Sequence, residues 1–229
     1  MIDTICLDAG GTLVWPNWAR VADASAAEGI AVDVSLLAAA DPRVRRSLDE
    51  RHLIGASTDQ NRGWSFFDDG LAMAGVELTP DAHRALSYIE EYQRTSNIWE
   101  HVPEGVVPTL AELRRSGYKL VVVSNANGTV QRAFRRVGLL DLVDFIVDSA
   151  DVGFEKPDRR LFGEALRLAA TDHSRALHVG DMYHIDVAGA RAAGLTPVLV
   201  DEANLLRGGR LPPDPPDRRA AGTTVSNYV

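Results

Sequence analysis

Four side chains able to handle a phosphate group stand just beyond short apolar runs of the chain. They are Asp8, Ser124, Lys156 and Asp181. A carboxylate can act as a nucleophile, a hydroxyl can donate a hydrogen bond, and a lysine can neutralise negative charge. Phosphoryl transfer needs an in-line nucleophile, a cation and donors that spread charge over the equatorial oxygens. These residue types therefore favour that reaction, provided that the fold brings them together.

Magnesium is the cation that these residues favour. Its ligands in proteins are hard oxygen atoms, and a few carboxylates complete a site together with phosphate and water. Asp186, five residues after Asp181, adds a further carboxylate. We therefore expect Mg²⁺ as the cofactor and a small phosphorylated molecule as the binding partner.

The apolar runs predict buried strands. Short runs rich in Val, Ile and Leu, without alternating polar residues, are typical of strands covered on both faces. The runs are Ile2–Leu7, Leu120–Val123, Phe145–Val147, Ala176–Val179 and Pro197–Val200. Helical patterns, several followed by a glycine that favours a helix end, lie between them at Val107–Ser116, Val130–Val137, Arg160–Ala169 and Val187–Ala193. The alternation predicts an α/β fold with a doubly wound parallel sheet, whose ligands bind beyond the carboxyl ends of the strands.

Residues 14–98 interrupt this alternation. They hold helical patterns and no convincing buried strand. We therefore expect an inserted α-helical cap domain over 14–98 and an α/β core domain over 1–13 and 99–229. The expected cap helices are Trp18–Glu28, Leu36–Leu53, Asn61–Ala74 and Pro80–Thr95. In the tail, Arg207–Arg219 is expected as a loop and Thr223–Val229 as a peripheral strand.

Four short motifs resemble those of the haloacid dehalogenase superfamily, in the order and at the spacing typical of that family. The motifs are Asp8–Leu13, Val121–Asn125, Gly153–Asp158 with Phe162, and Gly180–Asp181 with Asp186. Each motif alone is a weak or moderate signal, whereas the ordered set is specific. The resemblance covers roughly residues 1–13 and 99–200, and 14–98 fall where that family places a helical cap. It implies a Rossmann-like core and a hydrolase activity.

The resemblance also implies a role for each matching residue. Asp8 would attack phosphorus and form an aspartyl-phosphate, while Ser124 and Lys156 would bind the phosphoryl group. Thr12 would brace the nucleophile loop, and Thr12 and Asn125 would complete the phosphate site. The metal ligands would be Asp8, the Gly10 carbonyl, Asp181 and Asp186.

One position departs from the family's pattern. Phosphatases of this family usually carry a second Asp two residues after the nucleophile, where it serves as general acid and then as base. Here that position is Gly10. General acid–base catalysis is worth about 10²–10⁴ in rate, so we expect slow turnover of alkyl phosphates. Glu155, His52 or a group of the substrate could replace the missing acid, and the sequence leaves that choice open.

Relatives that lack this Asp suggest other reactions. Haloacid dehalogenases attack carbon without a metal and have an altered fourth motif, so the intact Asp181 and Asp186 argue against that reaction. Phosphonate-cleaving relatives use a cap lysine, whereas the two lysines of the chain, Lys119 and Lys156, lie outside 14–98. We therefore favour a phosphohydrolase of substrates with good leaving groups. The rival hypothesis is a non-catalytic or low-activity regulatory protein.

Several other residues receive structural interpretations. Cap residues at helical spacing are expected mainly in the cap core; they are Trp15, Asn17, Trp18, His52, Arg62 and Trp64. A solvated helix face is expected for Arg43, Arg45, Arg46 and Arg51, and structural or surface positions for His101, His173, His178 and His184. Asp148 and Asp151 are expected as loop carboxylates, Lys119 as solvated, and Cys6 as a buried thiol.

Composition excludes several broad classes of function. The net charge of −8 disfavours a general nucleic-acid or anionic-membrane binder. No apolar stretch is long enough to span a bilayer, and a single cysteine rules out an internal disulfide framework. We expect a cytoplasmic protein, and nothing in the sequence indicates its oligomeric state.

Overall fold

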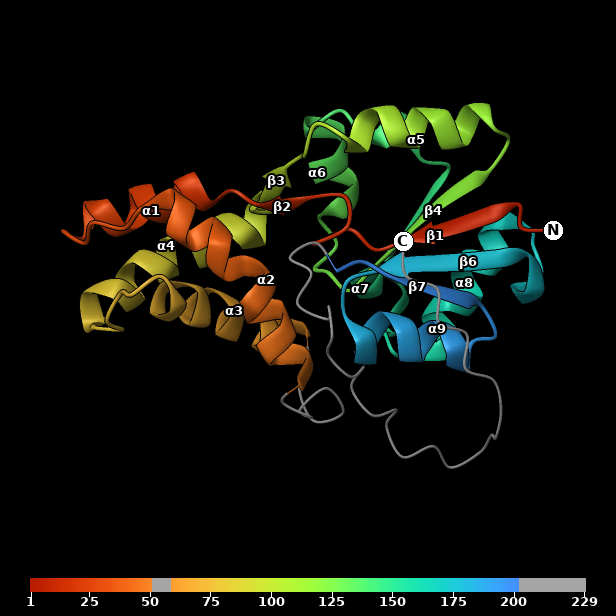
Figure 1. Cartoon of the computed structure of the whole chain (residues 1–229). Helices are drawn as coiled ribbons and strands as arrows, with labels where there is room; N and C mark the ends of the chain where they lie inside the picture. Colours follow the sequence, from red (N-terminus) through yellow and green to blue (C-terminus); the bar gives the residue numbers. More distant parts are fainter. Residues whose placement is uncertain (51–58, 202–229) are drawn as a thin grey trace.

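A five-stranded parallel sheet forms the centre of the computed structural model, which describes residues 1–50 and 59–201 (Figure 1). Its strands are β1 (Thr4–Leu7), β4 (Lys119–Ser124), β5 (Phe145–Asp148), β6 (Ala176–Gly180) and β7 (Thr196–Leu199). Their order is β5-β4-β1-β6-β7, and every neighbouring pair is parallel. The apolar runs of the sequence are therefore the strands of one sheet, and the predicted α/β fold is confirmed.

Helices cover both faces of this sheet because successive strand residues point to opposite sides. Val122 of β4 packs in one buried cluster with Phe134, whereas its neighbour Val123 packs in another with Phe162. The helices of this region are α5 (Val106–Arg115), α6 (Val130–Arg136), α7 (Ser149–Val152), α8 (Arg159–Ala169) and α9 (Ala188–Ala192). Burial on both faces explains why the strands carry no polar alternation.

Four further helices lie beyond the carboxyl ends of the strands, on the left of Figure 1. They are α1 (Trp18–Ala27), α2 (Val34–Glu50), α3 (Asp59–Met73) and α4 (Pro80–Thr95). Each corresponds to one of the helices expected within 14–98. They share a buried cluster of their own, which includes Leu37, Phe67 and Ile89. A separate apolar cluster supports the proposed division into a cap and a core.

A short antiparallel ribbon joins the cap helices to the sheet region. In it, β2 (Trp15–Pro16) pairs with β3 (Trp99–His101). The sequence predicts no convincing buried strand over 14–98, and β2 could not be recognised because a two-residue strand is too short to show a periodic pattern. The chain therefore enters and leaves the helical region along two segments that lie side by side.

Glu100 in β3 ties this ribbon to both regions. Its carboxylate accepts hydrogen bonds from Asn17 (2.9 Å), Arg20 (3.1 Å), Tyr92 (2.9 Å) and Arg136 (2.8 Å). Arg136 belongs to α6, and the other three donors belong to the helical region or its entry. Burial acts to raise the pKa of Glu100, but these hydrogen bonds outweigh it and hold the pKa below its usual range. An ionised carboxylate thus fixes the junction at neutral pH.

Two expectations for the tail fall beyond Asp201, where the described residues end. They are the loop over Arg207–Arg219 and the strand over Thr223–Val229. Within residues 1–50 and 59–201, no helix combines the length and the apolar character needed to cross a membrane.

Candidate active site

Lys156 and Asp8 form the centre of a charged cluster at the carboxyl ends of the strands. Asp8 is the first residue beyond β1, and its backbone N–H donates to the Val179 carbonyl oxygen at 2.8 Å. Lys156 Nζ donates to Asp8 Oδ1 at 2.6 Å and to Asp186 Oδ1 at 2.7 Å. The Lys156 side chain is only 1% exposed. Two carboxylates therefore hold one ammonium group in a place where an unpaired charge would be costly.

The side chain of Asn125 positions Lys156. Its Nδ2 donates to the Lys156 carbonyl oxygen at 3.0 Å, and its Oδ1 accepts from the Lys156 N–H at 2.6 Å. Asn125 was expected to contact phosphate, but its amide group is engaged with the backbone of Lys156. Burial acts to lower the pKa of Lys156, yet Asp186 and Asp8 raise it above its ordinary value. The lysine therefore remains a cation.

Three carboxylates converge at the same place. Asp8, Asp181 and Asp186 each offer an oxygen atom, and these atoms lie within 4.8 Å of one another. Clustered carboxylate oxygens suit a hard cation such as Mg²⁺, which takes few protein ligands and completes its shell with water and phosphate. The donor set therefore fits the expected metal.

Burial perturbs the ionisation of this cluster. It raises the pKa of Asp8, and it raises the pKa of Asp181 to about 8. Burial also acts to raise the pKa of Asp186, but the Lys156 charge and the His178 hydrogen bond together hold that pKa below its usual range. A divalent cation favours the ionised form of each ligand, so metal binding is expected to displace protons from Asp8 and Asp181.

A tight turn follows Asp8. The N–H groups of Leu13 and Val14 both donate to the Ala9 carbonyl oxygen at 2.9 Å, and Gly11 adopts a left-handed conformation with φ of 75°. Thr12 was expected to brace this loop, but its buried hydroxyl has no hydrogen-bond partner among the described residues. Within the described residues, the Thr12 hydroxyl therefore contributes no hydrogen bond to the loop.

A cavity of about 940 Å³ lies between this cluster and the cap helices. Its core side includes Asp8, Gly10, Ser124, Asn125, Lys156, Asp181 and Asp186. Its cap side includes Arg45, Phe66, Phe67 and Glu90. The charged residues of the cluster lie on the core side of the cavity, and the rings of Phe66 and Phe67 lie on its cap side. The site can therefore hold a small molecule with an anionic end near Lys156 and an organic part against the rings.

A family model described as haloacid dehalogenase-like hydrolase matches residues 2–194. The chain belongs to the haloacid dehalogenase-like hydrolase family. This match covers four of the five strands of the sheet, the cap helices and every residue of the charged cluster, and it ends just before β7. It confirms the resemblance drawn from the four sequence motifs.

Relatives of this haloacid dehalogenase-like hydrolase include haloacid dehalogenase-like hydrolase domain-containing protein 3 of Bos taurus. That protein is 42% identical over 102 residues, which are 44% of this chain and 40% of the relative. Glyceraldehyde 3-phosphate phosphatase of Methanothermobacter thermautotrophicus is 39% identical over 94 residues, 41% of this chain and 42% of that enzyme. The chain thus spans less than half the length of either relative. A magnesium-bound putative HAD-hydrolase from Bacillus subtilis has the same fold, with a TM-score of 0.63, 19% identity and 87% of each chain covered.

Arg45 of the hydrolase contradicts one sequence expectation. It was expected on a solvated helix face, but it is only 8% exposed. Its Nη1 donates to Asp181 Oδ2 at 3.2 Å, and its Nε donates to Asp41, which also accepts from Trp18 Nε1 at 3.1 Å. Arg43, two residues earlier, is exposed as expected. The expectation failed at Arg45 because the polar face of α2 lies against the core domain.

Asp49, one turn further along α2, makes a second contact with the core. It accepts the backbone N–H groups of Tyr183 and His184, both at 2.9 Å. These groups begin a π-helix (Tyr183–Val187) that runs into α9 and carries Asp186. Met182, which precedes the π-helix, has no side-chain hydrogen bond that caps it. A carboxylate of the cap therefore accepts the first backbone N–H groups of a core helix. The helix predicted over Val187–Ala193 continues a helical segment that already begins at Tyr183.

His178 also touches the site. It is 0% exposed in β6, and its Nε2 lies 2.9 Å from Asp186 Oδ1. Its expected structural position is correct, but the contact with Asp186 was not foreseen. The available signal was a polar residue inside an apolar strand, two residues before Gly180.

The remaining interpretations have mixed outcomes. Trp18 is buried in the cap core and Cys6 is a buried free thiol, as expected. Asn17 instead caps α1, and Trp15 lies in β2. Asp148 is not a loop carboxylate: it ends β5, is 3% exposed, and accepts the Gly128 N–H at 3.0 Å. Of the residues interpreted from the sequence, four have side chains outside the described part, namely Arg51, His52, Arg62 and Trp64.

Proposed function

We propose that this protein is a magnesium-dependent phosphohydrolase that acts on a small phosphorylated substrate through an aspartyl-phosphate on Asp8. The observation that carries the proposal is the buried Lys156, 2.6 Å from Asp8 and 2.7 Å from Asp186. The ammonium group keeps both oxygens in place and offers positive charge beside the nucleophile. Such an arrangement is typical of a carboxylate that attacks an anionic group.

In the first step, an oxygen of Asp8 attacks phosphorus, the new oxygen–phosphorus bond forms, and the bond to the leaving oxygen breaks. Ser124 donates a hydrogen bond to the phosphoryl oxygens, and Lys156 offsets their charge. In the second step, water attacks the same phosphorus, the bond between the Asp8 oxygen and phosphorus breaks, and phosphate leaves with the protons of the water, which restores the Asp8 carboxylate. Mg²⁺, held by Asp8, Asp181, Asp186 and the Gly10 carbonyl, would supply positive charge to the phosphoryl oxygens.

The relatives support the phosphatase assignment, since one of them is named a glyceraldehyde 3-phosphate phosphatase. Two alternative functions, a metal-free dehalogenase and a non-catalytic protein, would require different features of the site. A metal-free dehalogenase has no need of three carboxylates within 4.8 Å of one another. A non-catalytic protein has no need of an oriented nucleophile. The site favours hydrolysis of a phosphate over both alternatives.

A comparison of the natural protein with Asp8→Asn tests the proposal. Phosphorylated metabolites, acyl phosphates and an aryl phosphate would be assayed with Mg²⁺. The variant should keep its fold, as judged by circular dichroism, and lose turnover by about 10³-fold or more. Beryllium fluoride, which mimics an aspartyl-phosphate, should inhibit the natural protein. Equal turnover by the two proteins would remove Asp8 from the mechanism.

A further inference from the structure

In the proposed reaction, negative charge develops on the leaving oxygen, and none of the roles assigned so far stabilises that charge. In an in-line displacement, the leaving oxygen lies opposite the attacking carboxylate. Asp8 attacks from the end of β1, so the leaving oxygen points away from the sheet, towards the cap helices (Figure 1). Gly10 offers no acid there. The negative charge that develops on the leaving oxygen must therefore be met by a group of the cap, of the core beside it, or of the solvent.

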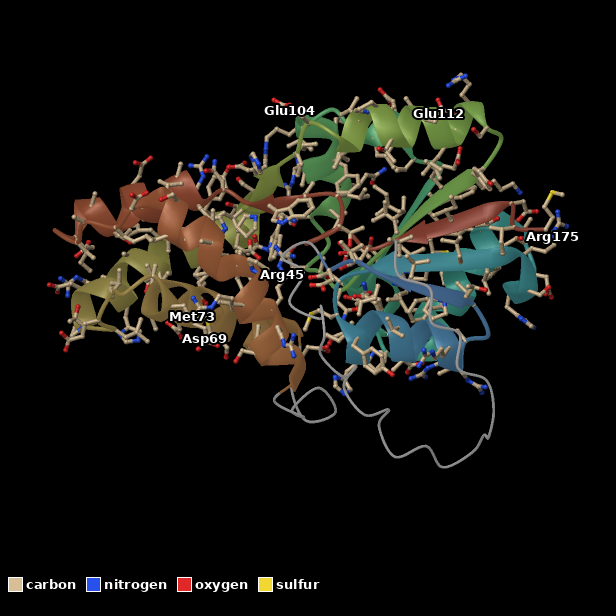
Figure 2. The ribbon with its side chains drawn as sticks, in the orientation of Figure 1. Arg45, Asp69, Met73, Glu104, Glu112 and Arg175 are labelled. Atoms are coloured by element: carbon tan, nitrogen blue, oxygen red, sulfur yellow. The ribbon has the colours of Figure 1, made fainter. Side chains whose placement is uncertain are left out.

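Arg45 stands on that side of the cavity. Figure 2 shows it between the cap helices and the carboxyl ends of the strands. Its guanidinium lies directly on the nucleophile loop, because a β-carbon built on Gly11 would overlap Arg45 Nη1. Gly11 is the neighbour of Gly10. The positive charge of Arg45 is thus placed beside the residue where the family usually carries its acid.

The other cations of the cavity are placed less favourably. Among the described residues, its cationic lining consists of Arg45, Arg94 and Lys156. Lys156 is held by Asp8 and Asp186 on the nucleophile side. The Arg94 side chain is 70% exposed, so water screens its charge. Arg45 alone of the three is both buried and carried by the cap.

The contacts of Arg45 leave one of its nitrogen atoms without a hydrogen bond to the described part of the chain. Asp41 accepts from Nε and holds the guanidinium from within the cap, whereas Nη1 bonds Asp181 of the core. Nη2 makes an ion pair with Asp41 but no hydrogen bond within the described part of the chain. The ring of Trp99, 5.2 Å from the guanidinium carbon, forms a wall beside it. A cation on Asp181 repels Nη1, and an anionic leaving oxygen attracts it.

We propose that Arg45 stabilises the leaving oxygen in place of the missing general acid. The inference rests on the proposed phosphohydrolase activity. As the phosphorus–oxygen bond breaks, the leaving oxygen keeps the electron pair, and guanidinium N–H groups donate hydrogen bonds to it. Arginine does not give up its own proton at physiological pH. The released alkoxide or phenoxide therefore takes its proton from water.

A series of aryl phosphates with graded leaving-group pKa tests this role in the natural protein, Arg45→Met and Arg45→Lys. Loss of a group that stabilises developing charge costs about 10²–10³ in rate. Arg45→Met should lose that much for the poorest leaving group and less than about tenfold for the best, so that the dependence on leaving-group pKa steepens. Arg45→Lys should fall between the two. Arg43→Met, an exposed position on the same helix, should match the natural protein.

Chemical rescue separates chemistry from folding. Guanidinium ion at millimolar concentration should restore part of the activity of Arg45→Ala towards poor leaving groups, and it should not stimulate Glu155→Gln. If the Arg45 variants lose the same factor in rate for every ester of the series, and guanidinium ion restores none of it, Arg45 only supports the structure. A steepened dependence in Glu155→Gln, with none in Arg45→Met, would assign the role to Glu155. If the natural protein hydrolyses none of the esters, the proposed function fails and this inference fails with it.

Discussion

The indole ring of Trp99 lies against Gly10. A β-carbon built on Gly10 would stand 3.1 Å from Trp99 Cε3 and Cζ3, closer than side chains usually pack. Gly11 has a positive φ, whereas Gly10 does not, so the backbone of Gly10 could accept another residue. The obstacle to an acid at position 10 is therefore the ring of Trp99. Trp99 itself is fixed by Phe66, with ring centroids 5.3 Å apart.

Restoring the missing acid should therefore need two changes. Gly10→Asp alone is expected to raise alkyl-phosphate turnover only slightly, because the new side chain meets Trp99. Gly10→Asp with Trp99→Leu should raise it further, within the ceiling of about 10²–10⁴ for general acid catalysis. Values of kcat/KM for alkyl and aryl phosphates would be compared, with Trp99→Leu as the control. A single variant that gains as much as the double variant would show that the ring yields easily.

Lys156→Met should damage both stability and activity. It leaves Asp8 and Asp186 buried beside each other without their shared cation, which typically costs about 3–5 kcal/mol. Urea unfolding of the metal-free protein would measure this loss, and Mg²⁺ should recover part of it. The matched control is Lys119→Met, because Lys119 is the other lysine of the chain and is exposed. Equal stabilities of the two variants would contradict the assigned ion pairs.

The metal-free protein should become less stable as the pH rises towards 8. The pKa of Asp181 is raised by burial from about 3.8 to about 8. A carboxyl group with a raised folded-state pKa stabilises the fold at low pH, and this contribution is lost as pH rises through the folded value. The loss from Asp181 is at most about 1.4 kcal/mol per pH unit between pH 4 and 8. Thermal unfolding in chelator should show a flatter profile for Asp181→Asn than for the natural protein, and an identical profile would refute the assignment.

Removal of the metal should abolish turnover. Excess chelator is expected to stop phosphate release, and added Mg²⁺ should restore it. Asp181→Asn and Asp186→Asn should each weaken Mg²⁺ binding, measured by titration calorimetry without substrate. Undiminished phosphate release in excess chelator would contradict the proposed dependence on Mg²⁺.

The sheet and the helices could be predicted because their residues carry periodic patterns. Buried strands such as Leu120–Val123 and amphipathic helices such as Pro80–Thr95 can be recognised from the spacing of apolar residues within the segment itself. The β2–β3 ribbon could not be predicted in this way. Trp15 and Pro16 form a strand only because the chain leaves the cap beside the point where it enters.

The candidate site was predicted unevenly for a related reason. Asp8 and Asp181 directly follow β1 and β6, and Lys156 follows β5 after the short helix α7, so the fold brings all three to one edge. Arg45 reaches the same place from a different part of the chain, and its role depends on how α2 packs against the nucleophile loop. A hint was present in the four-residue spacing of Asp41, Arg45 and Asp49 along one helix face. Such spacing equally suits solvated ion pairs, which is why it could not decide the matter.

The scarcity of lysine gives the molecule a practical property. Lys119 begins β4, at the amino ends of the parallel strands, while Lys156 is enclosed at the opposite ends. An amine-reactive linker that attaches to a side chain within residues 1–50 and 59–201 therefore reacts at Lys119. A protein immobilised through that residue would present its cavity to the solution, because the attachment point lies on the far side of the sheet.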